Sequence, residues 1–333
     1  MNRREFIVGL AAGAVLTATA KARGVTDVTE SPTGRGKRST TAVALVKTRE
    51  RAPGIARAIG LLKVNPVKGK AVLLKPNFNT ADAYPASTHN DTLEALFIHL
   101  KGKGAKSITL GERSGPPDTG EVMREKGIID LCRKHDVKII NFEDLLEKDW
   151  VRVQPEGSHW RNGVLVARPV VEVEYVVTTC CLKTHGYGGV FTMSLKLSVG
   201  VTNKKNMSEL HTSFRSMRKM IAEINTAYAP SLIVMDGITV FTDKGPSHGP
   251  KRDAEVIVAG TDRIAIDAVG LAVLKDLGSN RDIMEKRIFE QEQISRAVEL
   301  GLGVRGPEEI DIKADDEVGK NYAKRLKDIL SQG

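Results

Sequence analysis

The feature that most constrains this chain is the alternation of short β-branched runs with helical stretches along its first half. Strands that alternate with helices form a mostly parallel sheet with helices on its faces. The sequence therefore predicts an α/β fold with a mixed, mostly parallel sheet flanked by helices. The predicted elements alternate as strand 41–47, helix 54–62, strand 71–74, helix 91–101, strand 107–110, helix 121–135 and strand 137–140.

The second half adds further strands and longer helices, and a helical stretch is also predicted from Met193. Asn90 and Asp262 are predicted helix caps. We expect one α/β domain over residues 41–315, in one or two lobes, and a C-terminal helix over residues 316–333. The predicted elements are strands 151–153, 164–167, 170–179, 231–235 and 255–259 and helices 214–228, 262–277, 287–300 and 320–330.

Composition narrows the classes of function. The chain has 41% hydrophobic residues, 31 Gly and 3 Cys in 333 residues, which excludes collagen-like, low-complexity and disulfide-scaffold proteins. A formal net charge of +9 can indicate nucleic acid binding, but the basic residues are scattered and aromatics make up only 5%. We therefore expect no nucleic acid partner, and we assign the charge to solubility and to a small anionic ligand.

The N-terminus has the pattern of a twin-arginine export signal. Arg3 and Arg4 stand directly before an apolar run over residues 6–20, and small residues suited to cleavage follow, ending at Ala22. The run is shorter than the roughly 20 apolar residues that span a bilayer, so no stable membrane anchor is expected. The alternative is an uncleaved amphipathic anchor. We predict a signal peptide over residues 1–22.

The predicted signal implies a route and a destination. The twin-arginine translocase would be a partner, and it exports folded proteins, so we expect a periplasmic or extracytoplasmic location. Assembly of a cofactor or metal in the cytoplasm is one reason for this route, and fast folding is another. Residues 23–40 are rich in Gly, Ser, Thr and charge, which predicts a flexible linker.

Polar side chains follow four of the predicted strands. Open α/β sheets bind ligands outside the carboxyl ends of their strands, so these residues are candidates for one shared site. A turn or helix cap is the alternative at any one of these positions. The candidates at the strand ends are Lys75, Asn77, Glu112, Arg113, Lys183, His185 and Asp236.

The glycine-rich segment over residues 183–196 is the strongest single candidate. Lys183 and Lys196 supply positive charge for an anion, and His185 can transfer a proton or ligate a metal near neutral pH. Thr192 and Ser194 add hydroxyl groups to the ligand-binding set. We predict catalytic roles for the two lysines and the histidine; a mobile basic loop is the alternative.

A buried carboxylate is predicted at Asp267. The helix over residues 262–277 is apolar nearly all round, and Asp267 is the one charge in its interior. A buried carboxylate needs a cation, a metal or strong donors. One alternative places Asp267 in the site as a ligand or orienting group, and the other makes it a structural partner of an arginine or a backbone amide. With Asp236 and His185, it forms a candidate set of divalent-metal ligands.

Taken in order, these segments resemble the bacterial and archaeal family known as domain of unknown function 362, over about residues 75–303. The resemblance implies a mixed α/β domain, a prokaryotic origin and an uncharacterised activity, with ferredoxin-type cysteine motifs in some relatives. Glu112 and Leu197 depart from residues common in the family. The resemblance depends on residues 75–77, 111–115, 183–185, 192, 194–196, 236–237, 245–246 and 259–267.

The cysteines do not follow those relatives. Cys132, Cys180 and Cys181 contain no C-x-x-C pair, so a four-cysteine iron–sulfur cluster is not expected in this chain. One of the adjacent pair could bridge to Cys132 after export. The interpretation we favour makes all three small buried apolar groups.

These observations lead to a hypothesis about function. We expect an enzyme that acts on a small anionic substrate in a cationic pocket at the strand ends, with a divalent metal as an open alternative. A second hypothesis is a non-catalytic periplasmic protein that binds a metal or an organic anion. A third, a structural or interaction protein, would predict an exposed apolar patch instead of a charged pocket.

Overall fold

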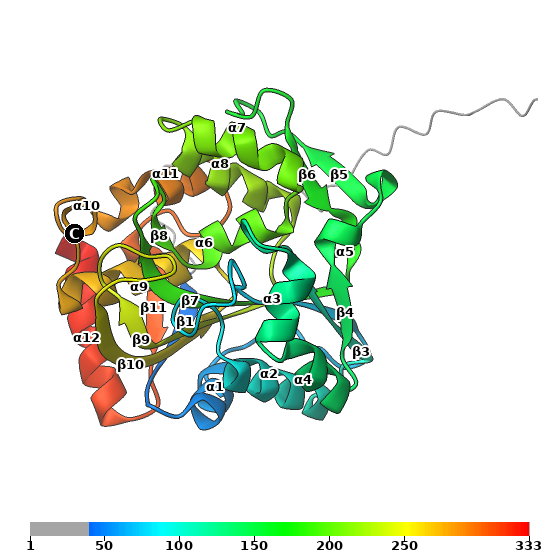
Figure 1. Cartoon of the computed structure of the whole chain (residues 1–333). Helices are drawn as coiled ribbons and strands as arrows, with labels where there is room; N and C mark the ends of the chain where they lie inside the picture. Colours follow the sequence, from blue (N-terminus) through cyan, green and yellow to red (C-terminus); the bar gives the residue numbers. More distant parts are fainter. Residues whose placement is uncertain (1–39, 333) are drawn as a thin grey trace, which may run out of the picture. The chain divides into compact units, whose positions relative to one another are not determined.

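The computed structural model describes residues 40–332. The predicted signal peptide over residues 1–22 lies outside the described residues, and so does the linker except for residue 40. The sequence prediction of an α/β fold is confirmed, since a nine-stranded, mostly parallel sheet carries helices on both faces (Figure 1).

The large sheet has the strand order β11-β1-β10-β9-β7-β2-β3-β4, and β8 pairs with β7 beside this path. Only β10 and β8 run antiparallel to their neighbours in the described sheet. A separate hairpin contains β5 (Trp150–Val153) and β6 (Val164–Ala167). The strands of the large sheet are β1 (Thr41–Lys47), β2 (Ala71–Lys75), β3 (Ser107–Glu112), β4 (Lys138–Asn141), β7 (Tyr175–His185), β8 (Val190–Thr192), β9 (Leu232–Phe241), β10 (Lys251–Gly260) and β11 (Ile310–Lys313).

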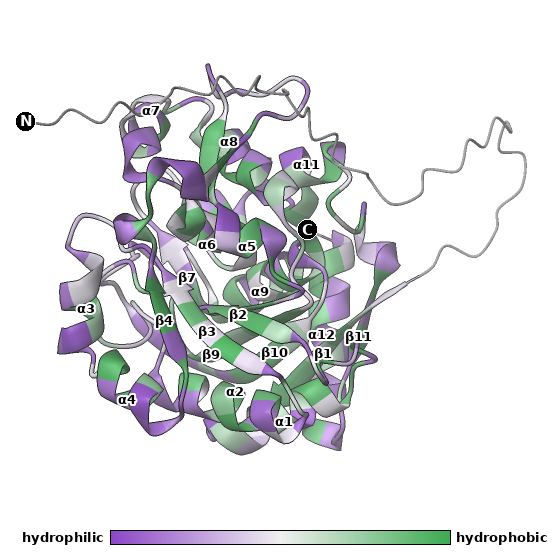
Figure 2. Ribbon diagram, turned by 90° about the vertical axis from the view of Figure 1, so that its right-hand side faces the viewer, coloured by the Kyte–Doolittle hydropathy of each residue, from purple (hydrophilic) through white to green (hydrophobic). Residues whose placement is uncertain are grey.

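Helices α1 to α4 cover one face of the sheet, and the later helices cover the other (Figure 2). The first face is covered by α1 (Arg51–Gly60), α2 (Asn90–Gly102), α3 (Thr119–Glu125) and α4 (Ile128–Lys134). The later helices are α5 (Arg168–Glu172), α6 (Ser194–Leu197), α7 (Met207–Thr212), α8 (Met217–Ile224), α9 (Arg263–Leu277), α10 (Arg281–Met284), α11 (Glu292–Glu299) and α12 (Glu317–Gln332).

The central strands and α9 are buried for the reasons that the sequence indicates. All but the last residue of β7 is buried, as expected of a strand with a helical layer on each side. Helix α9 is buried from Arg263 through Leu274, in line with its apolar sequence. Asp262 caps α9 as predicted, because its carboxylate accepts a hydrogen bond from the amide of Ala265 at 2.9 Å.

Several predicted elements are wrong in extent or type. The predicted helix over residues 121–135 is two helices, because Gly127 has a φ of 68° and breaks the hydrogen-bond ladder between α3 and α4. The predicted strand over residues 170–179 begins only at Tyr175, since the preceding residues form α5 with Pro169 in its first turn. The cap of α2 is His89, one residue before the predicted Asn90.

Other helices are shorter than predicted. The long helix expected over residues 214–228 contains α8 followed by the 3₁₀ turn η5 (Asn225–Ala227). The helix expected over residues 287–300 contains the 3₁₀ turn η6 (Ile288–Glu290) and α11. The stretch from Met193 forms only the four-residue α6, which leads into the 3₁₀ helix η3 (Ser198–Val201).

The order of strands reverses at β2. The chain runs outward from β2 to β3 and β4, and then returns to place β7 on the other side of β2. Such a reversal opens a crevice at the carboxyl ends of the two strands, where ligands bind in open α/β sheets. Lys75 ends β2, and Lys183 and His185 end β7, so predicted site residues stand on both sides of this crevice.

Candidate functional site

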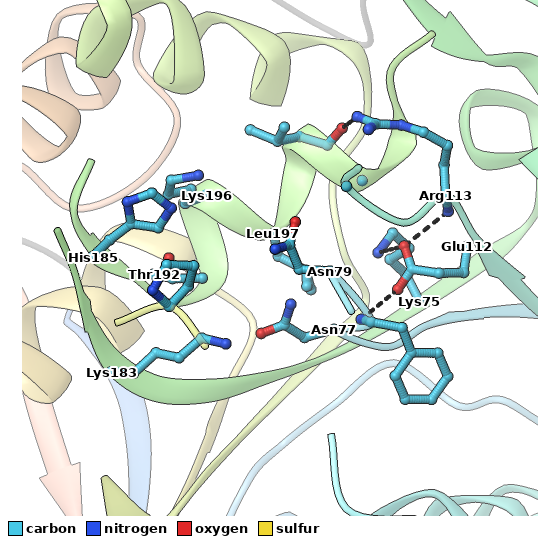
Figure 3. Close-up of a pocket in the computed structure, with 15 residues that line it drawn as sticks. Lys75, Asn77, Asn79, Glu112, Arg113, Lys183, His185, Thr192, Lys196 and Leu197 are labelled. Carbon is cyan, nitrogen blue, oxygen red and sulfur yellow. Dashed lines mark hydrogen bonds and ion pairs between the residues drawn. The ribbon is translucent and has the colours of Figure 1, made fainter. Parts of the chain in front are cut away.

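A pocket lies at the carboxyl ends of β2, β3 and β7, under α6 and η3 (Figure 3). Its cavity volume is about 50 Å³. A single water needs about 10–15 Å³ on the same measure, so the pocket has the capacity for a ligand of a few heavy atoms. The lining residues are Lys75, Asn77, Phe78, Asn79, Glu112, Arg113, Gly115, Lys183, His185, Thr192, Lys196, Leu197, Val199, Gly200 and Pro246.

Lys75 and Glu112 form a buried ion pair on one side of the pocket. The distance from Nζ to Oε1 is 2.5 Å, and both side chains are 1% exposed. The Glu112 carboxylate also accepts hydrogen bonds from the amides of Phe78 at 2.8 Å and Arg113 at 2.9 Å, and Lys75 donates to the carbonyl of Pro76 at 2.7 Å. Burial lowers the pKa of Lys75 and raises the pKa of Glu112, and each group's charge opposes the shift of the other.

The guanidinium of Arg113 holds the roof of the pocket in place. Its Nε donates to the carbonyl of Thr202 at 2.9 Å, and its terminal nitrogens donate to other backbone carbonyls. These bonds fix η3, where Gly200 lies directly over the buried pair. A Cβ atom at position 200 would lie 2.6 Å from Nζ of Lys75 and 2.8 Å from Oε1 of Glu112, so the close approach requires glycine.

Lys183 and Thr192 lie side by side on the opposite wall. They are paired residues in the antiparallel β7–β8 ladder, which places their side chains on the same face. Lys183 is fully buried, and its Nζ donates to the carbonyl of Ala86. Burial lowers the pKa of Lys183, and no carboxylate among residues 40–332 forms an ion pair with it.

His185 and Lys196 converge above this wall at the tip of the β7–β8 hairpin (Figure 3). A Cβ atom at Gly189 would lie 2.7 Å from Cε of Lys196 and 3.0 Å from Nδ1 of His185, so the two side chains approach one glycine. Nδ1 of His185 accepts a hydrogen bond from the amide of Tyr187 at 3.2 Å, which leaves the proton of the neutral ring on Nε2.

The positive charges in the pocket shift one another's pKa values. Burial, followed by the charges of Lys183 and Arg113, lowers the pKa of Lys196 to about 8. Burial and the charges of Lys196 and Lys183 hold the pKa of His185 well below its usual value, so the ring is neutral near pH 7. The Lys196 amine has no hydrogen bond or ion pair with the described part of the chain.

Two further polar atoms in the pocket lack partners. Oδ1 of Asn77 and Oγ1 of Thr192 are buried and have no hydrogen-bond partner among the described residues. A buried polar atom without a partner costs roughly 1–3 kcal/mol, so such atoms mark a place where a ligand or water completes the site. These two atoms line the same cavity as the amines of Lys183 and Lys196. No carboxylate in the lining forms an ion pair with either amine.

Ser194 and Asp267 belong to the supporting structure and do not line the pocket. The Asp267 carboxylate accepts hydrogen bonds from the amides of Ser194 at 2.7 Å and Leu195 at 3.0 Å, and thus caps α6 from the side of α9. Burial raises the pKa of Asp267 to about 7. Of the two alternatives for Asp267, the structure therefore favours the structural one, in which its carboxylate binds backbone amides. These hydrogen bonds position the short helix that carries Lys196.

Asp236 is also bound to protein groups away from the pocket. Its carboxylate accepts hydrogen bonds from Arg51 at 2.8 Å, Tyr84 at 2.6 Å and Thr92 at 2.7 Å. The guanidinium of Arg51 stacks on the Tyr84 ring at 4.5 Å from its centroid. This network fastens the segment between β2 and α2, which includes the Ala86 carbonyl that holds Lys183.

The predicted metal set of His185, Asp236 and Asp267 is not assembled. The two carboxylates are occupied by the donors described above, and only His185 lines the pocket. Within residues 40–332 no group of three or more His, Cys, Asp or Glu side chains is arranged to hold a metal ion. Cys132, Cys180 and Cys181 are free and buried, and they form no such group.

Sequence reasoning missed part of the lining. Asn79, Gly200 and Pro246 all face the cavity. Asn79 follows directly on the motif at the end of β2, which is a signal that could have identified it. Pro246 enters on a loop held by a hydrogen bond from the amide of Gly186 to the carbonyl of Gly245 at 3.2 Å, and nothing local in the sequence indicates that contact.

No helix in the described part of the chain has both the length and the apolar character needed to cross a bilayer. The fold and the pocket define an α/β protein with a cationic cavity at a strand-order reversal. Residues 72–272, more than half of the chain, match the family described as Domain of unknown function (DUF362), and the chain belongs to this family.

Two further similarities were found, one in sequence and one in structure. A thylakoid-associated protein of Synechocystis sp. is 24% identical over 213 residues, which is 62% of this chain and 64% of that protein. The lactate racemase apoprotein of Thermoanaerobacterium thermosaccharolyticum is similar in structure, with a TM-score of 0.42 and 14% identity over 66% of this chain and 54% of that one. This chain thus spans less than two thirds of the length of either protein.

Proposed function

We propose that this protein is an enzyme that acts on a small anionic substrate bound at the carboxyl ends of β2 and β7. The observation that carries the proposal is the charge balance of the pocket. Lys183 and Lys196 line it without a carboxylate partner, while the one carboxylate in the lining, Glu112, is taken up by Lys75. Buried charges need a counter-charge, and an anionic ligand supplies one here.

The arrangement also supports a division of roles. Lys183 and Thr192 bind the anionic group, because they are adjacent on one wall and each has hydrogen-bonding capacity that the protein leaves unused. Oδ1 of Asn77 is an acceptor without a partner, so it orients a hydroxyl or other donor group of the substrate or a bound water. His185 acts as the acid/base group, since its ring is neutral and so can accept a proton, and since it lies beside Lys196.

Isothermal titration calorimetry with phosphate, acetate and pyruvate tests the binding step. We expect one saturable site per chain for at least one anion, with affinity weakened about tenfold or more (~1.4 kcal/mol) in Lys183→Met. Lys63→Met removes an exposed lysine outside the pocket and should bind as the wild type does. Equal affinity in wild type and Lys183→Met would overturn the proposed site.

Proton NMR in D₂O separates catalysis from simple capture. An enzyme should convert one of a panel of small carboxylates and phosphate esters, or exchange its C–H protons, over many turnovers per chain. We expect His185→Gln to retain anion binding and to lose turnover. Binding without any time-dependent change across the panel would instead favour the non-catalytic alternative, a protein that captures an organic anion.

The proposal includes export through the twin-arginine translocase to the periplasm, with no stable membrane anchor and no nucleic acid partner. Its support is the paired arginines and the apolar run over residues 6–20. Replacing Arg3 and Arg4 by lysine should retain the protein in the cytoplasm, as measured by cell fractionation and N-terminal sequencing. Unchanged fractionation of this double variant would refute this part of the proposal.

A further inference from the structure

We propose that Lys196 forms a Schiff base with the carbonyl carbon of a small 2-oxo acid whose carboxylate is held by Lys183 and Thr192. This inference rests on the proposed anion pocket and names the substrate class and the nucleophile. It starts from the different surroundings of the three lysines that line the cavity (Figure 3).

Two of the three lysines already have a hydrogen bond or ion pair with protein groups. Lys75 is paired with Glu112 and donates to a backbone carbonyl. Lys183 is fully buried, and its amine donates to the carbonyl of Ala86. Lys196 alone is partly exposed and has no hydrogen bond or ion pair with any of residues 40–332.

The surroundings of Lys196 make its ammonium form less stable than that of an ordinary lysine. The groups that face it are Lys183 and His185 on β7 and Arg113 after β3, so the nearby charge is positive. A lysine next to other cations in a desolvated pocket is available as a nucleophile at neutral pH. Its lowered pKa agrees with this environment.

The size and polarity of the cavity select the electrophile. Its volume of about 50 Å³ suits a molecule such as glyoxylate or pyruvate. Thr192 stands opposite Lys183 in the β7–β8 ladder, and both side chains line the same cavity as Lys196, whose pKa the Lys183 charge lowers. A carboxylate bound by Lys183 and Thr192 therefore places its adjacent carbonyl carbon in the cavity that the Lys196 amine lines.

The reaction is balanced without an oxidant or a reductant. The Nζ lone pair of Lys196 attacks the carbonyl carbon, a C–N bond forms, and one amine proton moves from nitrogen to the carbonyl oxygen to give a carbinolamine. The nitrogen lone pair then forms the C=N bond as the C–O bond breaks. The departing hydroxyl group takes the second amine proton and leaves as water, so both amine protons end in the water.

Reductive trapping tests the proposal. The full chain is incubated with glyoxylate or pyruvate and sodium cyanoborohydride, and peptide mapping by mass spectrometry locates the product. We expect one carboxymethyl group (from glyoxylate) or one 1-carboxyethyl group (from pyruvate) per chain at Lys196, formed at least tenfold faster than at any surface lysine. Acetaldehyde, which lacks the carboxylate, should label Lys196 at least tenfold more slowly.

Matched variants make the result specific. Lys196→Arg keeps the positive charge and should lose the label, and Lys183→Met keeps the nucleophile and should slow labelling about tenfold or more. Lys63→Met should be labelled as the wild type is. Thermal melting of each variant identifies any that fails to fold, in which case Lys196→Met replaces Lys196→Arg.

Two results would overturn the proposal, and they differ in what else they affect. If pyruvate binds by calorimetry in a Lys183-dependent manner but no label forms at Lys196, the Schiff base is wrong and the anion pocket stands. If neither anion binding nor labelling occurs, both proposals are wrong. Labelling spread evenly over surface lysines also contradicts the assignment.

Discussion

Nζ of Lys75 lies 2.5 Å from Oε1 of Glu112, and both side chains are buried. Removing one partner of a buried pair leaves an uncompensated charge and costs about 3–5 kcal/mol. We expect Glu112→Gln and Lys75→Met each to lower the free energy of unfolding by that amount. The double variant should lose less than the sum of the two, as measured by urea denaturation and a double-mutant cycle. Additive losses would show that the pair is not coupled.

Asp267 positions the short helix that carries Lys196, because its carboxylate accepts two backbone hydrogen bonds at the start of α6. Asp267→Ala would leave the amides of Ser194 and Leu195 buried and unpaired, so we expect a loss of roughly 2–4 kcal/mol in stability. It should also weaken anion binding through Lys196.

The matched control for this variant is Asp130→Ala. Asp130 is an exposed acid whose ion pair with Arg133 lies at the surface of α4. Its loss should cost less than about 1 kcal/mol and leave anion binding unchanged. Comparable losses of stability in the two variants, measured by denaturant unfolding, would remove the structural role assigned to Asp267.

The roof of the pocket allows no side chain at position 200. A methyl group in Gly200→Ala would lie 2.6 Å from Nζ of Lys75, so η3 or the buried pair must shift. We expect at least a tenfold loss of anion affinity by calorimetry. Gly60→Ala is the control, because a Cβ atom there meets nothing within 4 Å. Wild-type affinity in Gly200→Ala would show that this contact does not shape the site.

The reactivity of Lys196 should follow its lowered pKa. The amine has a pKa of about 8, compared with about 10.4 for an unperturbed lysine, so its acetylation rate should rise with pH around a midpoint near 8. Lys183→Met removes a neighbouring positive charge and should move that midpoint upward. Quantitative mass spectrometry after limited acetylation measures the rate, and a midpoint near 10 in the wild type would contradict this assignment.

The lowered pKa of Lys196 also makes the stability of the folded chain depend on pH. Because the folded chain binds the Lys196 proton more weakly than the unfolded chain, the charged form opposes folding below pH 8. This cost disappears as the pH rises from about 8 toward 10.4, so stability should rise over that window. Lys196→Met should abolish this contribution to the pH dependence, as measured by denaturant unfolding at several pH values. If the difference in free energy of unfolding between pH 8 and pH 10 is the same in Lys196→Met and in the wild type, the assigned contribution of Lys196 is refuted.

Local sequence patterns predict the sheet and the convergence of its strand ends. Residues 41–47 form the predicted strand, and Lys75, Glu112 and Lys183 meet because the strands that carry them lie side by side in the sheet. This follows from the alternation of strands and helices together with the rule that ligands bind at carboxyl strand ends.

The roles of the aspartates depend on contacts that the sequence does not encode locally. Asp236 meets Arg51, which is 185 positions away, and Asp267 meets Ser194, which is 73 positions away. Both carboxylates are buried, as polar residues in apolar segments suggest, but burial does not identify the donor. For the same reason no local sequence pattern indicates that Gly200 lies above Lys75, since that contact exists only after η3 folds over the strand ends.

A crystal structure of the protein soaked with selenate, whose selenium is located by anomalous scattering, tests the proposed anion site most directly. We predict a peak in the pocket, with selenate oxygens within hydrogen-bond distance of Nζ of Lys183 and Nζ of Lys196, and no such peak in Lys183→Met. A pocket without selenate, at a concentration that occupies other surface sites, would contradict the proposed anion site.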